Sequence, residues 1–276
     1  MNIKLVGVTK KIKKNNVLEN INFEFESGKI HGIFGGHNSG KTLLLNLISN
    51  FCSPNSGEIL FDGVSKKNND LPICYISTNL TMVFNYKYNL KKFKEVFPNF
   101  DIEYANSLIE KFGLTSNRMD VTSSTGTMSL MRIIITLASN SRILIFDDII
   151  AGLDIFNRKL VYNEILEKYN KDKQTIFMAC SYLNEVEALL NDFIILNDSS
   201  IALSGCIDLL DRCYVISGAK DNVIKYENKK HVIKTKLDSF YEMVVIDSSE
   251  SEFENVEVRK ASLQDVISSY GGIYEE

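Results

Sequence analysis

The residues best able to do chemistry lie in one short stretch near the N-terminus. In order they are Gly35, Gly36, His37, Asn38, Ser39, Gly40, Lys41 and Thr42. They fit G-x-x-x-x-G-K-[ST], in which glycines let the backbone aim successive N–H groups at one anion. In such a loop the lysine reaches the outer phosphates of a nucleotide and the hydroxyl residue binds Mg²⁺. The stretch therefore predicts a phosphate-binding loop.

The flanking residues must place this loop between a strand and a helix. Before it, "KIHGIF" is apolar enough for a buried strand, and after it "KTLLLNLI" has apolar residues at helical spacing. A helix that begins at the loop points its positive N-terminus at the bound anion. The alternative is a purely structural glycine turn, which needs no such flanking elements.

A second candidate site ends an apolar strand further along the chain. The segment "SRILIFDDII" at residues 141–150 contains Asp147 and Asp148 in succession. Asp147 is in position to hold Mg²⁺ through water, as the second motif of phosphate-loop enzymes does. The alternative is an ordinary core strand with acids at its exposed end.

Composition limits the classes of protein that remain. With 276 residues, 45% of them hydrophobic, the chain is long enough for one large domain and a small one. The net charge of −4 gives no attraction to nucleic acid, so we expect no nucleic-acid partner. The five cysteines form no C-x-x-C pair, which is typical of reduced thiols in a cytoplasm.

The apolar runs are too short for the chain to span a membrane by itself. The start, "MNIKLVGVTKKIKKNN", lacks the apolar region of a signal peptide, and "RIIITLA" and "RILIF" are too short to cross a bilayer. If the protein serves a membrane process, we expect another chain to supply the membrane-spanning part.

Several further segments agree with one known family. They are "LENINFEFESGKIHGIFGG", "SPNSGEILFDG", "SSTGT" before the second motif, "AGLD" after it, and "SYLNEVEALLNDFIILNDSSIALSG". Together with the two motifs, they resemble the ATP-binding-cassette (ABC) ATPases in order and spacing over about residues 1–210. The run "VFPNFD" resembles the bacterial branch that exports lipids, antibiotics or peptides.

This resemblance implies the fold. We expect an α/β P-loop NTPase cassette over residues 1–210, with a doubly wound core, an antiparallel β layer and an inserted helical subdomain at about 87–138. In residues 211–276, charged residues alternate with β-branched ones, and this pattern predicts a small α+β C-terminal appendix. By resemblance it is regulatory or dimerising; the alternative is a packing cap. The expected elements are strands near 3–9, 17–26, 73–77, 142–147 and 174–180, helices over 41–49, 124–138, 156–169 and 182–191, and helical structure over 87–120.

The chain departs from the family at four positions. The catalytic glutamate after the second motif is replaced by Asp148, and the γ-phosphate histidine by Ser181. Thr78 stands where the family has a glutamine that senses Mg²⁺ and the membrane subunit, and Ile12 stands where an aromatic residue stacks on adenine. The resemblance therefore implies weakened catalysis and looser selection of the base.

The family's signature keeps its two contacting residues. By resemblance, Ser124 and Gly126 contact the γ-phosphate bound to the partner subunit in a head-to-tail dimer. Ser124 also suits the N-cap of the following helix, and the two roles are compatible.

The function implied is that of an ATP-binding subunit of an ABC transporter, with ATP and Mg²⁺ as cofactors. We expect it in the cytoplasm, peripheral on the inner face of the cell membrane, coupling slow hydrolysis to export by a separate transmembrane permease subunit. A second ABC ATPase would complete a hetero- or homodimer. The alternative is a catalytically degenerate regulatory subunit of a heteromeric ABC complex. A soluble ABC protein of translation or DNA repair is a third hypothesis, but such chains usually carry two cassettes or a long coiled coil.

Overall fold

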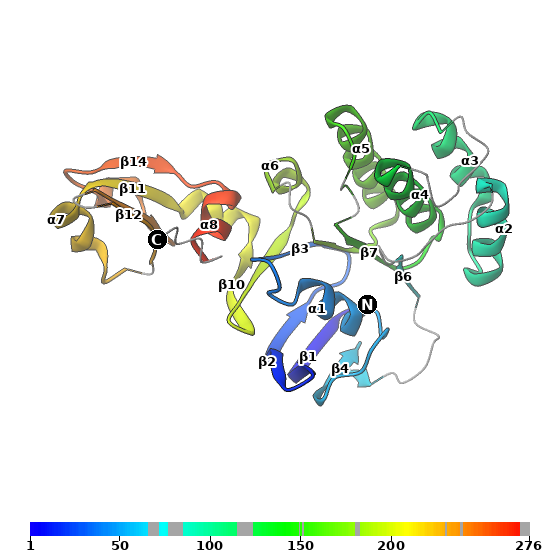
Figure 1. Ribbon diagram of the computed structural model, residues 1–276, viewed down its shortest axis with the longest axis horizontal. Coiled ribbons are helices and arrows are strands. Elements are labelled where there is room, and N and C mark those ends of the chain that lie inside the picture. The colour runs from blue at the N-terminus through cyan, green and yellow to red at the C-terminus, as the bar shows by residue number, and fades with distance from the viewer. Residues whose placement is uncertain are drawn as a thin grey trace.

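The structure, a computed structural model, describes residues 1–65, 72–76, 85–114, 124–148, 150, 152–179, 183–229, 231–237 and 240–270. Within these residues the strands form three sheets, with helices packed between and against them (Figure 1). Two sheets belong to the N-terminal three quarters of the chain and the third to its C-terminal part.

The first sheet is the antiparallel layer expected near the N-terminus. Its strand order is β2 (Asn15–Phe25), β1 (Ile3–Ile12), β4 (Ser56–Phe61) and β5 (Val64–Ser65). One face of β1 is apolar and buried, which turns that strand toward the rest of the protein. Both β1 and β2 extend closer to their connecting turn than the sequence predicted.

The second sheet is the α/β core, with strand order β10-β9-β3-β8-β7-β6. All its strands are parallel except β10, which is antiparallel to β9. Helices cover both of its faces, so the central strands are buried throughout, as expected for a parallel sheet. The bounds are β3 (Ile30–Gly35), β6 (Ile73–Tyr75), β7 (Ile143–Asp147), β8 (Thr175–Ala179), β9 (Asp192–Asn197) and β10 (Ser200–Cys206).

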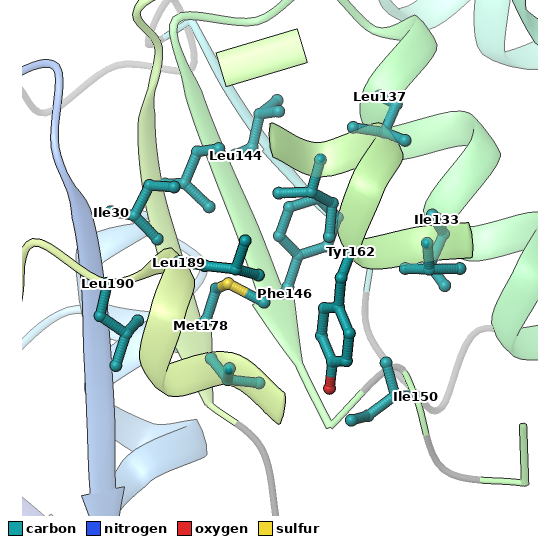
Figure 2. Packing of buried hydrophobic residues seen from close by; sticks show 14 of the residues in the cluster. Ile30, Ile133, Leu137, Leu144, Phe146, Ile150, Tyr162, Met178, Leu189 and Leu190 are labelled. Atoms are coloured by element: carbon teal, nitrogen blue, oxygen red, sulfur yellow. The ribbon is translucent and has the colours of Figure 1, made fainter. Parts of the chain in front are cut away.

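Helices pack on the two faces of this core. On one face, α1 (Lys41–Ile48) lies between the core and the antiparallel layer, and its leucines join one hydrophobic cluster with both sheets. The other face carries α4 (Thr125–Ala138) and α5 (Ile155–Asp172). There, Figure 2 shows Phe146 of β7 beside Tyr162 of α5, with Ile133 of α4 close by. This packing fixes the ends of β3 and β7, where the two motifs lie.

The predicted helical stretch over 87–120 is two helices in its described part. They are α2 (Tyr86–Val96) and α3 (Ile102–Lys111), and both pack on α4. Each begins at a side-chain cap, since Asn85 accepts a hydrogen bond from Tyr88 N and Asp101 from Tyr104 N. The interruption falls at "FPNF", where the proline disfavours continued helix.

The sequence predicted one helix over 182–191, and the helical segment there is shorter. It consists of α6 (Leu183–Val186) and a 3-10 turn at Glu187–Leu189. Leu190 is already extended, and the Asn191 backbone N–H donates to Ile30 O at 2.9 Å. The chain leaves the helix early because Asn191 is needed beside β3.

The third sheet has the order β12-β13-β11-β14 and is antiparallel, in keeping with an α+β tail. Its elements are β11 (Tyr214–Ala219), α7 (Lys220–Val223), β12 (His231–Leu237), β13 (Phe240–Val245), β14 (Glu257–Lys260) and α8 (Leu263–Tyr270). Helix α8 lies between this sheet and the core (Figure 1), contacting β12 and β13 as well as β3, β9 and α6.

The C-terminal part therefore shares a hydrophobic core with the cassette. Leu263 and Val266 of α8 belong to the same buried cluster as Ile30 of β3 and Phe193 of β9. The domain boundary near residue 210 stays a prediction. Among the described residues, no helix combines the length and apolar character needed to cross a bilayer.

Candidate functional site

The phosphate loop follows β3 and turns tightly into α1. Gly35 has φ 145°, and a Cβ on it would lie 2.3 Å from the carbonyl oxygen of Leu196 on β9. Gly40 has φ 99° and is the N-cap residue of α1. Both positions need glycine, and between them the backbone curls around the N-terminus of a helix, which attracts anions.

The lysine of the loop lies inside this curl. Its Nζ donates to Gly35 O at 2.9 Å and to Gly36 O at 2.8 Å. Burial lowers the pKa of Lys41, while the nearby charges of Asp147 and Asp148 raise it. The ammonium group is thus held at the loop by backbone oxygens, beside two carboxylates.

Asp147 ends β7 and is held by hydroxyl groups from two other elements. Thr42 Oγ1 donates to Asp147 Oδ1 at 3.2 Å, and Tyr75 OH donates to Asp147 Oδ2 at 3.1 Å. The side chain is nearly inaccessible, at 5% exposure of the residue. Burial raises the pKa of Asp147, while the hydrogen bonds from Thr42 and Tyr75 lower it and so favour the carboxylate.

The sequence did not single out Tyr75 as part of this site. It ends β6, which pairs in parallel with β7, so the carboxyl ends of the two strands meet at one edge of the sheet. Burial, and then the charge of Asp147, raise the pKa of Tyr75. The phenol therefore stays protonated and able to donate.

A pocket of about 700 Å³ gathers most of the predicted site, and its volume suits a small-molecule ligand. The predicted residues that line it are Ile12, His37, Asn38, Ser39, Gly40, Lys41, Thr42, Asp147 and Asp148. The lining residues that sequence reasoning missed are Lys13, Asn15, Val17, Leu43, Asn46 and Ala179. Lys13 directly follows Ile12 and Asn15 lies three residues after it, and this closeness in sequence was the signal that could have found them. The predicted Thr78 and Ser181 lie outside the described residues.

The rim of the pocket is more exposed than its inner end. Asp148 is exposed and has φ 48°, a left-handed conformation that aspartate tolerates better than most residues. Its backbone N–H donates to Ala179 O of β8 at 2.7 Å, which fixes the chain just past β7. Ile12, at the end of β1, is 53% exposed and offers the pocket an apolar surface without a ring.

The signature residues Ser124 and Gly126 lie outside this pocket, at the start of α4. Ser124 caps that helix by accepting a hydrogen bond from Thr127 N at 3.2 Å, as expected. A Cβ on Gly126 would lie 2.6 Å from Gly152 O, so the start of α4 packs directly on Gly152. Ser124 and Gly126 do not line the pocket described above.

The donor set fits a nucleotide with its metal ion. Hydroxyl and carboxylate oxygens, as on Thr42 and Asp147, are the ligands that Mg²⁺ prefers. A tight loop with no room for a Cβ at Gly35, and with the Lys41 ammonium group inside it, suits a polyphosphate.

Residues 18–151 match the ABC transporter family. The chain carries an ABC transporter ATP-binding domain. It is 28% identical over 218 residues to the ABC transporter ATP-binding protein YtrB of Bacillus subtilis, covering 77% of this chain and 75% of that protein. It is 25% identical to the energy-coupling factor transporter ATP-binding protein EcfA2 of Staphylococcus aureus over 68% of this chain and 72% of the relative.

Among solved structures, the fold of this chain resembles ABC cassettes. A dimeric ATP-binding cassette, MJ0796, in a post-hydrolysis state bound to ADP and Pi superposes with a TM-score of 0.64 at 18% identity. The alignment covers 74% of this chain and 98% of that one. The predictions of an ABC-type P-loop ATPase domain and of its cassette fold are thus confirmed. The sequence similarity is to ABC transporter ATP-binding proteins, and residues 18–151 carry the domain shared with them.

Proposed function

We propose that this subunit couples ATP binding and slow hydrolysis to export by a separate transmembrane permease subunit. The observation that carries the proposal is the pocket that brings Lys41, Thr42 and Asp147 together with Asp148 at its rim. A complete phosphate end supports tight binding of ATP. A shortened catalytic carboxylate supports slow turnover.

In this proposal the pocket residues have separate roles in binding and hydrolysis. Lys41 and the loop amides hold the phosphates, and Thr42 and Asp147 hold Mg²⁺, which neutralises charge on the phosphates when bound. Asp148 orients the attacking water, but its carboxylate lies one methylene, about 1.5 Å, short of where a glutamate would place it. A misplacement of this size costs roughly a hundredfold in rate. Ser181 would add a hydroxyl in place of an imidazole.

The working unit we propose is a heterodimer with a second, less degenerate ABC ATPase. Each site of such a dimer combines the phosphate loop of one chain with the signature of the other. One site would then contain this chain's Asp148 and Ser181 and be slow. The other would combine the partner's catalytic residues with Ser124 and Gly126, and the close approach of Gly126 to Gly152 supports a rigid signature. The protein would be peripheral on the cytoplasmic face of the cell membrane, where the permease supplies the export path.

Mixing this chain with its candidate ABC partner and measuring phosphate release tests the arrangement. Ser124→Arg should remove most of the activity because it blocks the fast site, whereas Asp148→Asn should remove little. Ser251→Arg, an exposed serine of the C-terminal part, is the matched control and should leave turnover unchanged. If Asp148→Asn abolishes turnover instead, this chain's own site carries the hydrolysis and the heterodimer proposal fails.

A second candidate is a regulatory subunit that binds ATP without useful turnover. The replacement of the glutamate by Asp148, on an exposed left-handed residue, favours it. Single-turnover measurement with the isolated protein separates the two functions. ATP converted to ADP at a slow but finite rate supports the catalytic subunit, and ATP recovered intact supports the regulator.

A further inference from the structure

Both oxygens of the buried carboxylate at the end of β7 accept hydrogen bonds from hydroxyl groups. Oδ1 of Asp147 faces Thr42 of α1, and Oδ2 faces Tyr75 of β6. Both donors precede β7 in the chain but belong to different elements, Thr42 to the first turn of α1 and Tyr75 to the end of the neighbouring strand β6. The two hydrogen bonds together favour one plane for the carboxylate group, because a partial rotation about its Cβ–Cγ bond would lengthen both.

The two hydroxyl groups have different relations to the metal site: one belongs to a proposed metal ligand, and the other only orients the carboxylate. Thr42 belongs to the phosphate loop and shares the metal with Asp147 in the proposed function. Tyr75 does not line the pocket, so its phenol contacts the carboxylate from outside the ligand space. A group that binds a metal ligand from behind sets its orientation, and removing such a group usually weakens the metal site.

We propose that Tyr75 is a positioning residue for the metal site, whose phenol holds Asp147 with one oxygen turned toward Thr42. The inference rests on the proposed function, since it assumes that ATP binds here with a divalent ion. It adds a residue outside the phosphate loop and the second motif to the metal site. Because Tyr75 acts only through Asp147, it should affect the metal and not the bare nucleotide.

The test compares Tyr75→Phe with wild type in two titrations. A fluorescent ATP analogue is titrated in EDTA to give the metal-free affinity. Mn²⁺ is then titrated onto the protein with ATP, and its binding is followed by electron paramagnetic resonance. Tyr75→Phe should raise the Mn²⁺ concentration at half-saturation roughly tenfold, with metal-free nucleotide affinity within about twofold of wild type.

A matched control removes a phenol that serves another carboxylate. Tyr104 OH donates to Glu164 Oε1 at 2.7 Å, between α3 and α5 and away from the pocket lining. Tyr104→Phe should leave the Mn²⁺ midpoint unchanged. The midpoint is read from folded sites only, so partial unfolding of a variant lowers the amplitude of its titration and does not imitate the predicted shift.

The remaining outcomes overturn one proposal or the other. A wild-type Mn²⁺ midpoint in Tyr75→Phe refutes the positioning role, and so does an equal loss of nucleotide affinity with and without metal, which marks a purely structural residue. If wild type itself binds neither the analogue nor Mn²⁺ with ATP, the proposed nucleotide function fails before Tyr75 is tested.

Discussion

The two ends of the nucleotide pocket are built differently. At its inner end, Lys41, Thr42 and Asp147 come from a buried strand end and the first turn of a helix, and hydrogen bonds hold each in place. At its outer end, Ile12, Lys13 and Asp148 are exposed. By the family resemblance, the inner end keeps the lysine, threonine and aspartate of the two motifs, whereas the outer end has Ile12 where an aromatic residue is expected and Asp148 where a glutamate is expected.

The difference separates groups that the fold holds in place from groups that are open to solvent. Phosphate and metal binding depend on groups that the cassette fixes by itself, because strand pairing and helix packing determine their positions. Selection of the base and activation of water depend on side chains at an open rim, which a second subunit can cover or replace. The comparison therefore predicts large effects for changes at the inner end and graded effects at the outer end.

The largest effect is expected for Lys41→Ala at the inner end. Loss of the ammonium group removes charge-assisted hydrogen bonds to the outer phosphates, which should weaken ATP binding by roughly a hundredfold or more. The folding should be unaffected, because within the described part of the chain the hydrogen bonds of the lysine go to the loop carbonyls of Gly35 and Gly36. Calorimetric titration with ATP measures the affinity, and the melting temperature without nucleotide reports the fold.

Lys13→Ala is the matched control, since Lys13 lines the same pocket from its exposed rim. A solvated charge contributes little, so its affinity should change by about twofold. Equal losses in the two variants would show that the inner and outer ends do not differ as described.

A smaller effect is expected at the rim from restoring the family's catalytic residues. The double variant Asp148→Glu with Ser181→His lengthens the carboxylate and adds an imidazole, and it should raise ATP turnover by the isolated chain roughly tenfold. Phosphate release at steady state measures the gain. Brisk turnover by wild type, or no gain in the double variant, would contradict the slow-site interpretation.

Asp148→Glu carries a backbone cost that needs its own control. Glutamate fits the left-handed conformation of residue 148 less well than aspartate does. Asp198 has a similar φ of 45° in the turn between β9 and β10. The stability lost in Asp198→Glu therefore estimates the backbone cost without touching the pocket.

The inner end could be predicted from sequence because its signals are local. Glycines at fixed spacing, an apolar strand before them and a helical pattern after them determine the loop within one continuous segment. Asp147 could be predicted for the same reason, because it directly follows an apolar run within one short segment. Tyr75 could not be predicted in this way, because its bond to Asp147 joins residues 72 positions apart and depends on which strands pair.

The C-terminal part shows the same limit on a larger scale. Its alternating strands and short helix were expected from the sequence. Yet the packing of α8 on β3 and β9 joins the two ends of the chain, and no local pattern encodes it. The early end of the helix after residue 182 has the same origin, because it depends on the hydrogen bond from Asn191 to Ile30 across the sheet.

The smallest effect concerns the base, at the outermost part of the pocket. Ile12 offers apolar contact without a ring, so we expect wild type to bind ATP and GTP with affinities within about threefold of each other, since methylene-sized apolar contacts discriminate weakly. Ile12→Tyr supplies a stacking surface, and stacking on an aromatic ring should tighten ATP binding about fivefold. Val64→Tyr, on an equally exposed strand residue outside the pocket lining, controls for the added ring itself. Parallel titrations of ATP and GTP with the three proteins measure these affinities.

If Ile12→Tyr binds ATP no better than Val64→Tyr does, the base does not rest on the end of β1, and the outer end of the pocket lies elsewhere. If wild type already prefers ATP strongly over GTP, other rim residues read the base, with Lys13 and Asn15 the first to test because they line the pocket next to Ile12.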